Sequence, residues 1–174
     1  MGNRKFLRQL SRNPTPLKTA MAFLEPVEKS YWLAKLCEAN FERLVRLIPD
    51  MAGMTTYSVA HAHGKPSLHV QLLEHSPYTV TLELSHCFSK GFELLLEPAV
   101  KIRVYFDARA AEVLSDHARP KIHQAFGRSG NAREVLDYKW SLNYFLSQWL
   151  DHCLANHYSF AISRAERDSY VEEA

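Results

Sequence analysis

The hydrophobic pattern of this chain changes its period twice, and no other feature of the sequence limits its fold as strongly. From about residue 55 to residue 107, β-branched and aromatic residues alternate with polar ones. A period of two is typical of strands buried on one side, whereas the flanking segments repeat every 3.6 residues, as amphipathic helices do. The pattern predicts an α+β fold: an antiparallel sheet of four to five strands, with an N-terminal and a long C-terminal helix packed on one face.

The two helices are predicted over residues 30–48 and 131–157. In the first, apolar residues recur every three or four positions until Pro49, which disfavours helical geometry at the residue before it. The second carries the longest such stripe, and Asn131 with Glu134 forms a candidate capping pair at its start. Strands are predicted near residues 55–63, 67–75, 78–87 and 99–107, with a weaker one near 92–96. The pattern does not decide whether residues 108–126 form a helix or a strand.

Alternation divides the side chains of this sheet between two faces. The apolar face is expected to take the helices and consists of Tyr57, Val59, Leu68, Val70, Leu72, Val80, Leu82, Leu84, Val100, Ile102, Val104 and Phe106. The polar face is expected to meet water, a ligand or a partner and consists of Ser58, Ala60, His69, Gln71, Thr79, Thr81, Glu83, Ser85, Lys101, Arg103, Tyr105 and Asp107.

A chain of 174 residues suits a single domain, predicted over residues 27–158. Residues 1–26 are predicted to be a basic, partly ordered arm, either solvated or docked on phosphate or an acidic protein, and residues 159–174 a charged tail. The net charge of +2 is too small to attract nucleic acid or a membrane by itself. An odd number of cysteines, three, and the lack of a signal peptide or apolar span predict a cytoplasmic protein with reduced thiols.

Three histidines are considered as candidate metal ligands. His61 and His63 lie on one predicted strand and His69 lies on the next. A three-residue turn would set His61 opposite His69, but we expect a two- or four-residue turn, because only that register places Tyr57 and Val59 on the apolar face. The sequence therefore predicts no metal site.

Known nucleotide- or cofactor-binding motifs, cysteine catalysis and RNA binding are also disfavoured. The sequence lacks a P-loop, a dinucleotide-binding glycine fingerprint and a Gly-x-Ser-x-Gly elbow, so no cofactor is expected. Cys37 and Cys153 lie on apolar helical stripes, where a thiol packs as a small hydrophobe. RNA binding is disfavoured because the polar face offers mainly Tyr105 for base stacking.

The candidate site is therefore the polar face. Glu83, Arg103 and Tyr105 would lie on neighbouring strands if the third and fourth strands pair, with Lys101 and Asp107 on the same face. A solvated face with weak surface ion pairs is the alternative. Glu38 and Asn40 of the first helix are secondary candidates, although Asn40 borders the apolar stripe and can equally satisfy buried backbone groups.

These observations favour a non-catalytic binding or regulatory module whose partner is a protein or a small anionic ligand. The alternative is an enzyme acting on a small phosphate- or carboxylate-bearing substrate. In that case Arg103 would orient the anion, and Glu83 or Asp107 would act as acid or base. The sequence leans away from an enzyme, and it does not fix the oligomeric state.

Three blocks of sequence resemble a known family. They are Leu36-Cys37-Glu38-Ala39-Asn40-Phe41; Arg103-Val104-Tyr105-Phe106-Asp107-Ala108 with Ala111-Glu112-Val113; and Phe145-Leu146 with Trp149-Leu150 and Cys153-Leu154. In this order, over roughly residues 30–157, they resemble the YqiB-like family of small uncharacterised proteobacterial proteins. The resemblance implies no activity, cofactor or site residue.

Overall fold

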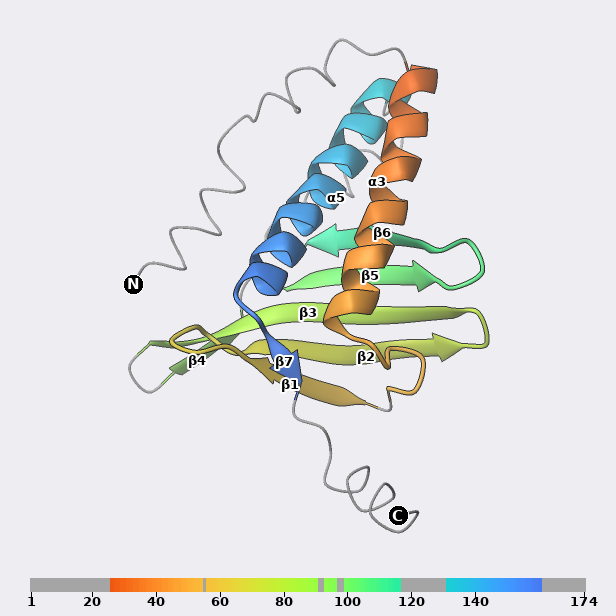
Figure 1. Cartoon of the computed structure of the whole chain (residues 1–174). Coiled ribbons are helices and arrows are strands. Elements are labelled where there is room, and N and C mark those ends of the chain that lie inside the picture. The colour runs from red at the N-terminus through yellow and green to blue at the C-terminus, as the bar shows by residue number, and fades with distance from the viewer. Residues whose placement is uncertain (1–25, 55, 91–92, 97–98, 117–130, 161–174) are drawn as a thin grey trace.

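The computed structural model describes residues 26–54, 56–90, 93–96, 99–116 and 131–160. Nearly all of the predicted basic arm and most of the predicted tail lie outside these residues. Two helices, α3 (Pro26–Leu47) and α5 (Ala132–Ala155), lie on one face of a seven-stranded sheet (Figure 1). The predicted α+β class and the placement of both helices are confirmed.

The sheet has more strands than predicted. Its strands are β1 (Tyr57–His61), β2 (Leu68–Ser76), β3 (Thr79–Lys90), β4 (Glu93–Leu96), β5 (Val100–Tyr105), β6 (Ala110–Asp116) and β7 (Ser159–Phe160). Their order is β6-β5-β3-β2-β1-β7, with β4 paired to the far part of β3, and every pair is antiparallel. The ambiguous segment after residue 107 thus supplies a strand, and the sheet continues to Phe160, two residues past the predicted domain end.

Local sequence explains where the helices begin and end. α3 begins at Pro26, which suits a first turn because no amide is needed there, and ends two residues before Pro49. The Asn131 side chain accepts a hydrogen bond from the Arg133 amide and caps α5. Beyond its other end, His157 has a φ of 55° and the Tyr158 amide donates to the Cys153 carbonyl at 3.2 Å. This closing arrangement is a Schellman motif, and it turns the chain toward β7.

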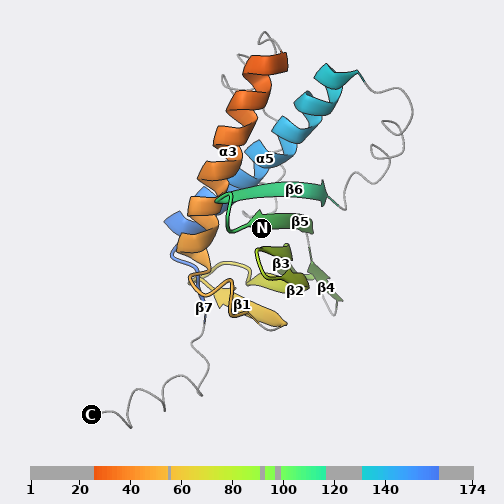
Figure 2. The same ribbon diagram turned by 90° about the vertical axis from the view of Figure 1, so that its right-hand side faces the viewer.

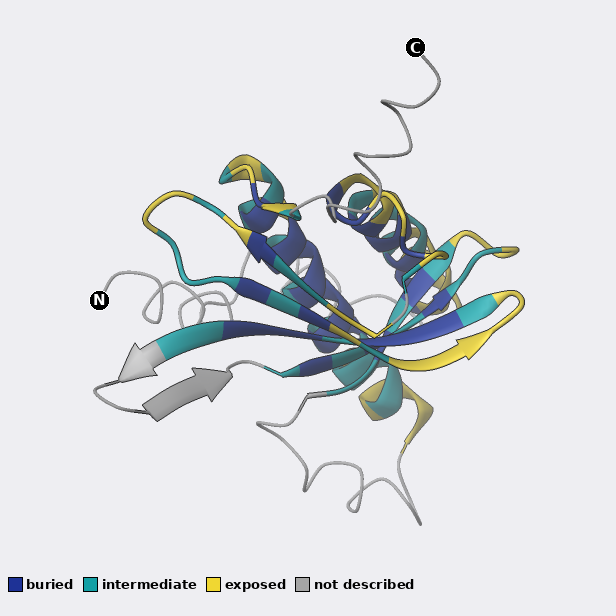
Figure 3. Ribbon diagram, turned by 90° about the horizontal axis from the view of Figure 1, so that it is seen from below, coloured by how far each residue is buried: buried dark blue, intermediate teal, exposed yellow. Residues whose placement is uncertain are grey.

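The core lies between the helices and the sheet. Leu44 of α3 and Trp149 of α5 are fully buried together with Leu82 and Ile102 of the central strands. Figure 3 shows buried segments along both helices and through the middle of the sheet. A second cluster, Leu33, Cys37, Trp140 and Tyr144, joins the N-terminal halves of the two helices to each other.

The face assignment is wrong for the first strand. Tyr57 lies opposite Gln71, and Val59 lies opposite His69, so both belong to the polar face, while Ala60 is fully buried opposite Leu68. Larger side chains from elsewhere, Met51 and Tyr158, belong to the same core cluster as Ala60. A small residue on β1 therefore completes the core, and the local alternation of Tyr57 and Val59 did not reveal it.

Candidate functional site on the open face of the sheet

The face of the sheet turned away from α3 and α5 is called the open face here, because the two described helices both cover the other side (Figure 2). Strand register places on it the side chains of Tyr57, Val59, His61, His69, Gln71, Glu74, Thr79, Thr81, Glu83, Ser85, Lys101, Arg103 and Tyr105. Most of them are polar. The open face therefore holds most of the predicted polar set in one layer.

Arg103 lies mid-strand on β5 and is held by two neighbours. Its Nη2 donates to Glu74 Oε2 at 3.1 Å, and its Nε donates to Thr81 Oγ1 at 3.3 Å. The Thr81 hydroxyl donates to the same Glu74 oxygen at 3.3 Å. Arg103, Thr81 and Glu74 thus form a closed network across three strands.

Glu83 and Arg103 lie on neighbouring strands, since β3 pairs with β5, but they are not directly opposite each other. In the observed register Thr81 faces Arg103, and Glu83 lies between Lys101 and Gln71. A bulge in β2 between Leu72 and Glu74 brings the Glu74 carboxylate onto the open face beside Arg103. Simple alternation would put Glu74, an even-numbered residue of β2, on the opposite face. The alternation pattern therefore did not identify Glu74 as a neighbour of Arg103.

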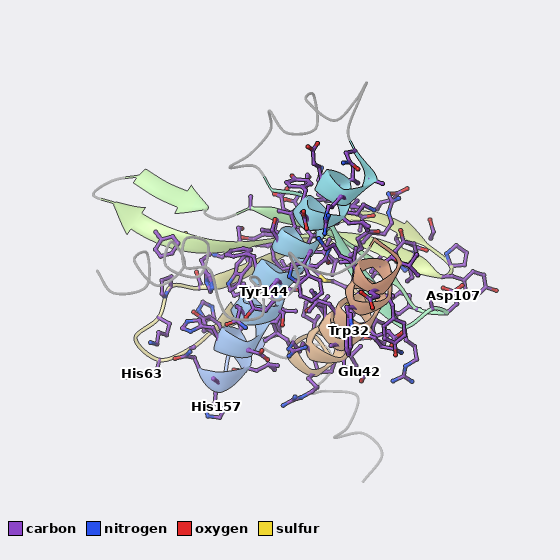
Figure 4. All side chains as sticks on the ribbon, turned by 90° about the horizontal axis from the view of Figure 1, so that it is seen from above. Trp32, Glu42, His63, Asp107, Tyr144 and His157 are labelled. Carbon is purple, nitrogen blue, oxygen red and sulfur yellow. The ribbon has the colours of Figure 1, made fainter. Side chains whose placement is uncertain are left out.

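The other predicted residues share the face only in part. Lys101 and Tyr105 are half-buried on β5, one on each side of Arg103. Asp107 is exposed in the turn after β5, because the strand ends at Tyr105. Figure 4 shows Asp107 at the opposite end of the molecule from His63. Asp107 is therefore not part of the strand surface that carries Arg103.

The secondary candidates lie elsewhere. Glu38 is half-buried and pairs with Lys35 at 2.7 Å. Asn40 is fully buried, and its Nδ2 donates to the Asn143 carbonyl at 3.0 Å. The Asn143 side chain in turn accepts from the Val113 amide of β6 at 3.0 Å. Asn40 and Asn143 therefore join α3, α5 and the edge strand β6 inside the fold.

Sequence reasoning missed a second polar group on the open face. His69 Nε2 lies 2.8 Å from Ser67 Oγ, and His69 Nδ1 is hydrogen-bonded to the Tyr57 hydroxyl. Burial, and to a smaller degree the nearby His61, lower the pKa of His69. The spacing of Ser67 and His69 predicts two side chains on one side of a strand, but Tyr57 joins them only in the corrected register.

The register argument against a metal site is also wrong, because His61 and His69 do share the open face. In the part of the chain that the structure describes, however, no three His, Cys, Asp or Glu side chains gather as metal ligands. No described helix is long and apolar enough to cross a membrane.

A cysteine–histidine pair exists, but between residues distant in sequence. His86 of β3 is buried, with its Nε2 3.9 Å from Cys153 Sγ of α5 and its Nδ1 3.3 Å from the Ser67 carbonyl oxygen. Burial lowers the pKa of His86 to about 4 and raises the pKa of Cys153 to about 12. Both groups are neutral near pH 7, so the pair lacks the thiolate that a cysteine nucleophile requires.

Fold and site together define a class: α+β proteins with a one-sided antiparallel sheet, two helices on its apolar face and a polar open face. Comparison with known proteins places the chain more closely. A family model described as "Protein of unknown function (DUF1249)" matches residues 43–159, and the chain belongs to this family.

Three curated relatives that the chain matches carry one name. The chain is 33% identical over 129 residues to "Uncharacterized protein YqiB" of Escherichia coli strain K12, covering 71% of this chain and 87% of the relative. The proteins of the same name from E. coli O6:H1 and O157:H7 match equally well. No solved structure matches the chain.

Proposed function

We propose that the chain is a binding or regulatory module that uses its open face, with Arg103 as the anchor for an anionic group. The observation that carries the proposal is the position of this guanidinium: mid-strand, half-buried, and on the side that the described helices leave uncovered. The ligand would be a small carboxylate- or phosphate-bearing molecule or an acidic segment of a partner protein. Binding of this kind needs no catalytic step.

A ligand anion can displace Glu74, the present partner of Arg103, at a small cost in free energy. The side chain of Glu74 is 61% exposed and that of Arg103 is 37% exposed, so their ion pair is screened by water and contributes under about 1 kcal/mol. A ligand carboxylate or phosphate could take the place of the Glu74 carboxylate, because the planar guanidinium binds both groups through two parallel hydrogen bonds. Lys101 would add a second positive charge, and Tyr105 an aromatic surface.

Catalysis on a small anionic substrate is supported less well. In that reaction Arg103 would orient the anion while Glu83 or Asp107 transferred a proton. Glu83 faces Lys101, and Asp107 lies beyond the end of the strand. Neither carboxylate is placed directly beside the position at which Arg103 would hold an anion.

Thermal unfolding with added anions tests the binding proposal. We expect inorganic phosphate or succinate to raise the melting temperature of the wild-type protein, because a ligand that binds only the folded state stabilises it. Arg103→Lys keeps the charge but loses the fork, so the rise should shrink at least severalfold while the free energy of unfolding without ligand changes by less than about 1 kcal/mol.

The matched control is Arg46→Lys, which changes an exposed arginine of α3, far from this face. It should respond to the anions as the wild type does. An equal response in all three proteins would make the open face plain solvated surface, and a large loss of stability in Arg103→Lys alone would make the Arg103–Glu74 pair structural. Native mass spectrometry of gently purified protein would then identify a retained ligand directly.

A further inference from the structure

Three side chains at one end of the open face form a chain of hydrogen bonds. Ser67 precedes β2, His69 is the second residue of β2, and Tyr57 begins β1. The Ser67 hydroxyl and His69 Nε2 are 2.8 Å apart, and His69 Nδ1 bonds to the Tyr57 hydroxyl. A hydroxyl, an imidazole and a third group that orients the ring are the parts from which serine nucleophiles are built.

The histidine is suited to act as a base. In a neutral imidazole one nitrogen carries a proton and the other accepts one. With Nδ1–H donating to the Tyr57 oxygen, Nε2 is left to accept the Ser67 proton. His69 stays neutral near pH 7, because partial burial and the neighbouring His61 lower its pKa. The ring is only half-buried and Tyr57 is 51% exposed, so a substrate can reach the group from solvent.

The serine is also fixed from the core side. Its carbonyl accepts from the Cys87 amide of β3 at 2.9 Å and lies 3.3 Å from Nδ1 of the buried His86. The carbonyl of the preceding Pro66 accepts from the Tyr158 hydroxyl at 2.7 Å. Two buried side chains thus hold the backbone that presents the Ser67 hydroxyl to His69. Such preorganisation distinguishes a reactive serine from a rotating surface hydroxyl.

We propose that Ser67 is an activated nucleophile that accepts an acyl group from carboxylic esters, with His69 as its base and Tyr57 as the residue that orients His69. The Ser67 oxygen forms a bond to the acyl carbon while the bond from that carbon to the alcohol oxygen breaks. The Ser67 proton passes to His69 Nε2 and from there to the departing alcohol. Water then attacks the acyl-serine, and its proton returns through Nε2 to the Ser67 oxygen.

This site shares no residue with the Arg103 network, so the two proposals fail separately. Loss of anion binding in Arg103→Lys leaves Ser67, His69 and Tyr57 intact. Conversely, a chain that binds anions at Arg103 need not acylate Ser67. The rate of deacylation measures how fast the acyl-serine is turned over.

The experiment uses p-nitrophenyl acetate with the full chain, following nitrophenolate release and mapping the acetyl group by peptide mass spectrometry. With the reaction quenched before deacylation, we expect an acetyl group on Ser67 in the wild type and none at that position in Ser67→Ala. His69→Gln should slow acylation about a hundredfold, the range for loss of a positioned base. Tyr57→Phe, which lacks the oxygen acceptor, should slow it less. Ser76→Ala changes a serine at the far end of β2, which faces Thr79, and is the matched control: Ser67 in this variant should be acylated as in the wild type.

A second readout needs no variant. The acylation rate of the wild type should rise with pH through an inflection below 6.5, the ordinary value for histidine, because His69 must lose its proton before it can accept the one from Ser67. Acetylation that maps to Cys87 or to lysines, an unchanged rate in Ser67→Ala or His69→Gln, or a rate without this inflection would each overturn the proposal.

Discussion

At the scale of single residues, burial of His86 makes the stability of the fold depend on pH. The ring lies 5.4 Å, centre to centre, from both Trp149 and Tyr158, and burial lowers its pKa to about 4. In the unfolded chain the same ring has its ordinary pKa of 6.5. Between these values the unfolded state binds a proton that the folded state does not, so stability rises with pH across this window.

The free energy of unfolding should therefore be at its full value above pH 6.5 and fall by on the order of 3 kcal/mol as the pH decreases to 4. Urea unfolding of the wild type and of His86→Phe over this range measures the effect. His69 and His152 have pKa values lowered in the same direction, but both titrate in both proteins, so the difference in slope isolates His86. Parallel profiles would show that His86 is not the group responsible.

At the scale of secondary-structure elements, the end of α5 contains a residue in an unfavourable conformation. His157 has a φ of 55°, in the left-handed region where a side chain with a Cβ costs about 1 kcal/mol or more. Glycine is preferred at this position of a Schellman motif. His157→Gly should raise the free energy of unfolding by about 0.5 kcal/mol, after the larger unfolded-state entropy of glycine is subtracted.

His63→Gly supplies the control, since His63 is also an exposed histidine outside helix and strand but does not have a positive φ. Without strain to relieve, it should lose stability through the entropy of the unfolded chain alone. Both changes are measured by chemical denaturation. Equal effects of the two substitutions would mean that the left-handed conformation of His157 carries no cost.

Elements were predicted from the sequence more successfully than their register. The periods of 3.6 and 2 located both helices and the first five strands, because periodicity reports which side of an element is buried. Register depends on partners that a local pattern does not contain. The pairing of Tyr57 with Gln71 and the bulge before Glu74 both follow from contacts with other strands, and together they changed which groups meet on the open face.

At the scale of the whole molecule, both helices pack on the sheet, and Leu44 of α3 and Trp149 of α5 lie in one core cluster with its central strands. The sequence predicts this arrangement, because the stripe that contains Trp149 needs a large apolar surface and the sheet supplies one. The sequence could not predict which side chains of the sheet contact Trp149. His86 of the sheet packs against Trp149 of the helix, so a polar ring lies where the pattern indicated only hydrophobic packing.

Truncation of Trp149 tests whether its contacts with the sheet hold the two layers together. Its side chain is fully buried in the main core cluster, and Trp149→Ala should lower the free energy of unfolding by about 3 to 5 kcal/mol, as for large aromatic residues in cores. Trp32 of α3 is 50% exposed, and Trp32→Ala should cost much less, below about 1 kcal/mol. Urea unfolding of both variants compares the same substitution at a buried and at an exposed tryptophan. A loss below about 1 kcal/mol for Trp149→Ala, or equal losses for both variants, would show that α5 does not join the layers through this residue.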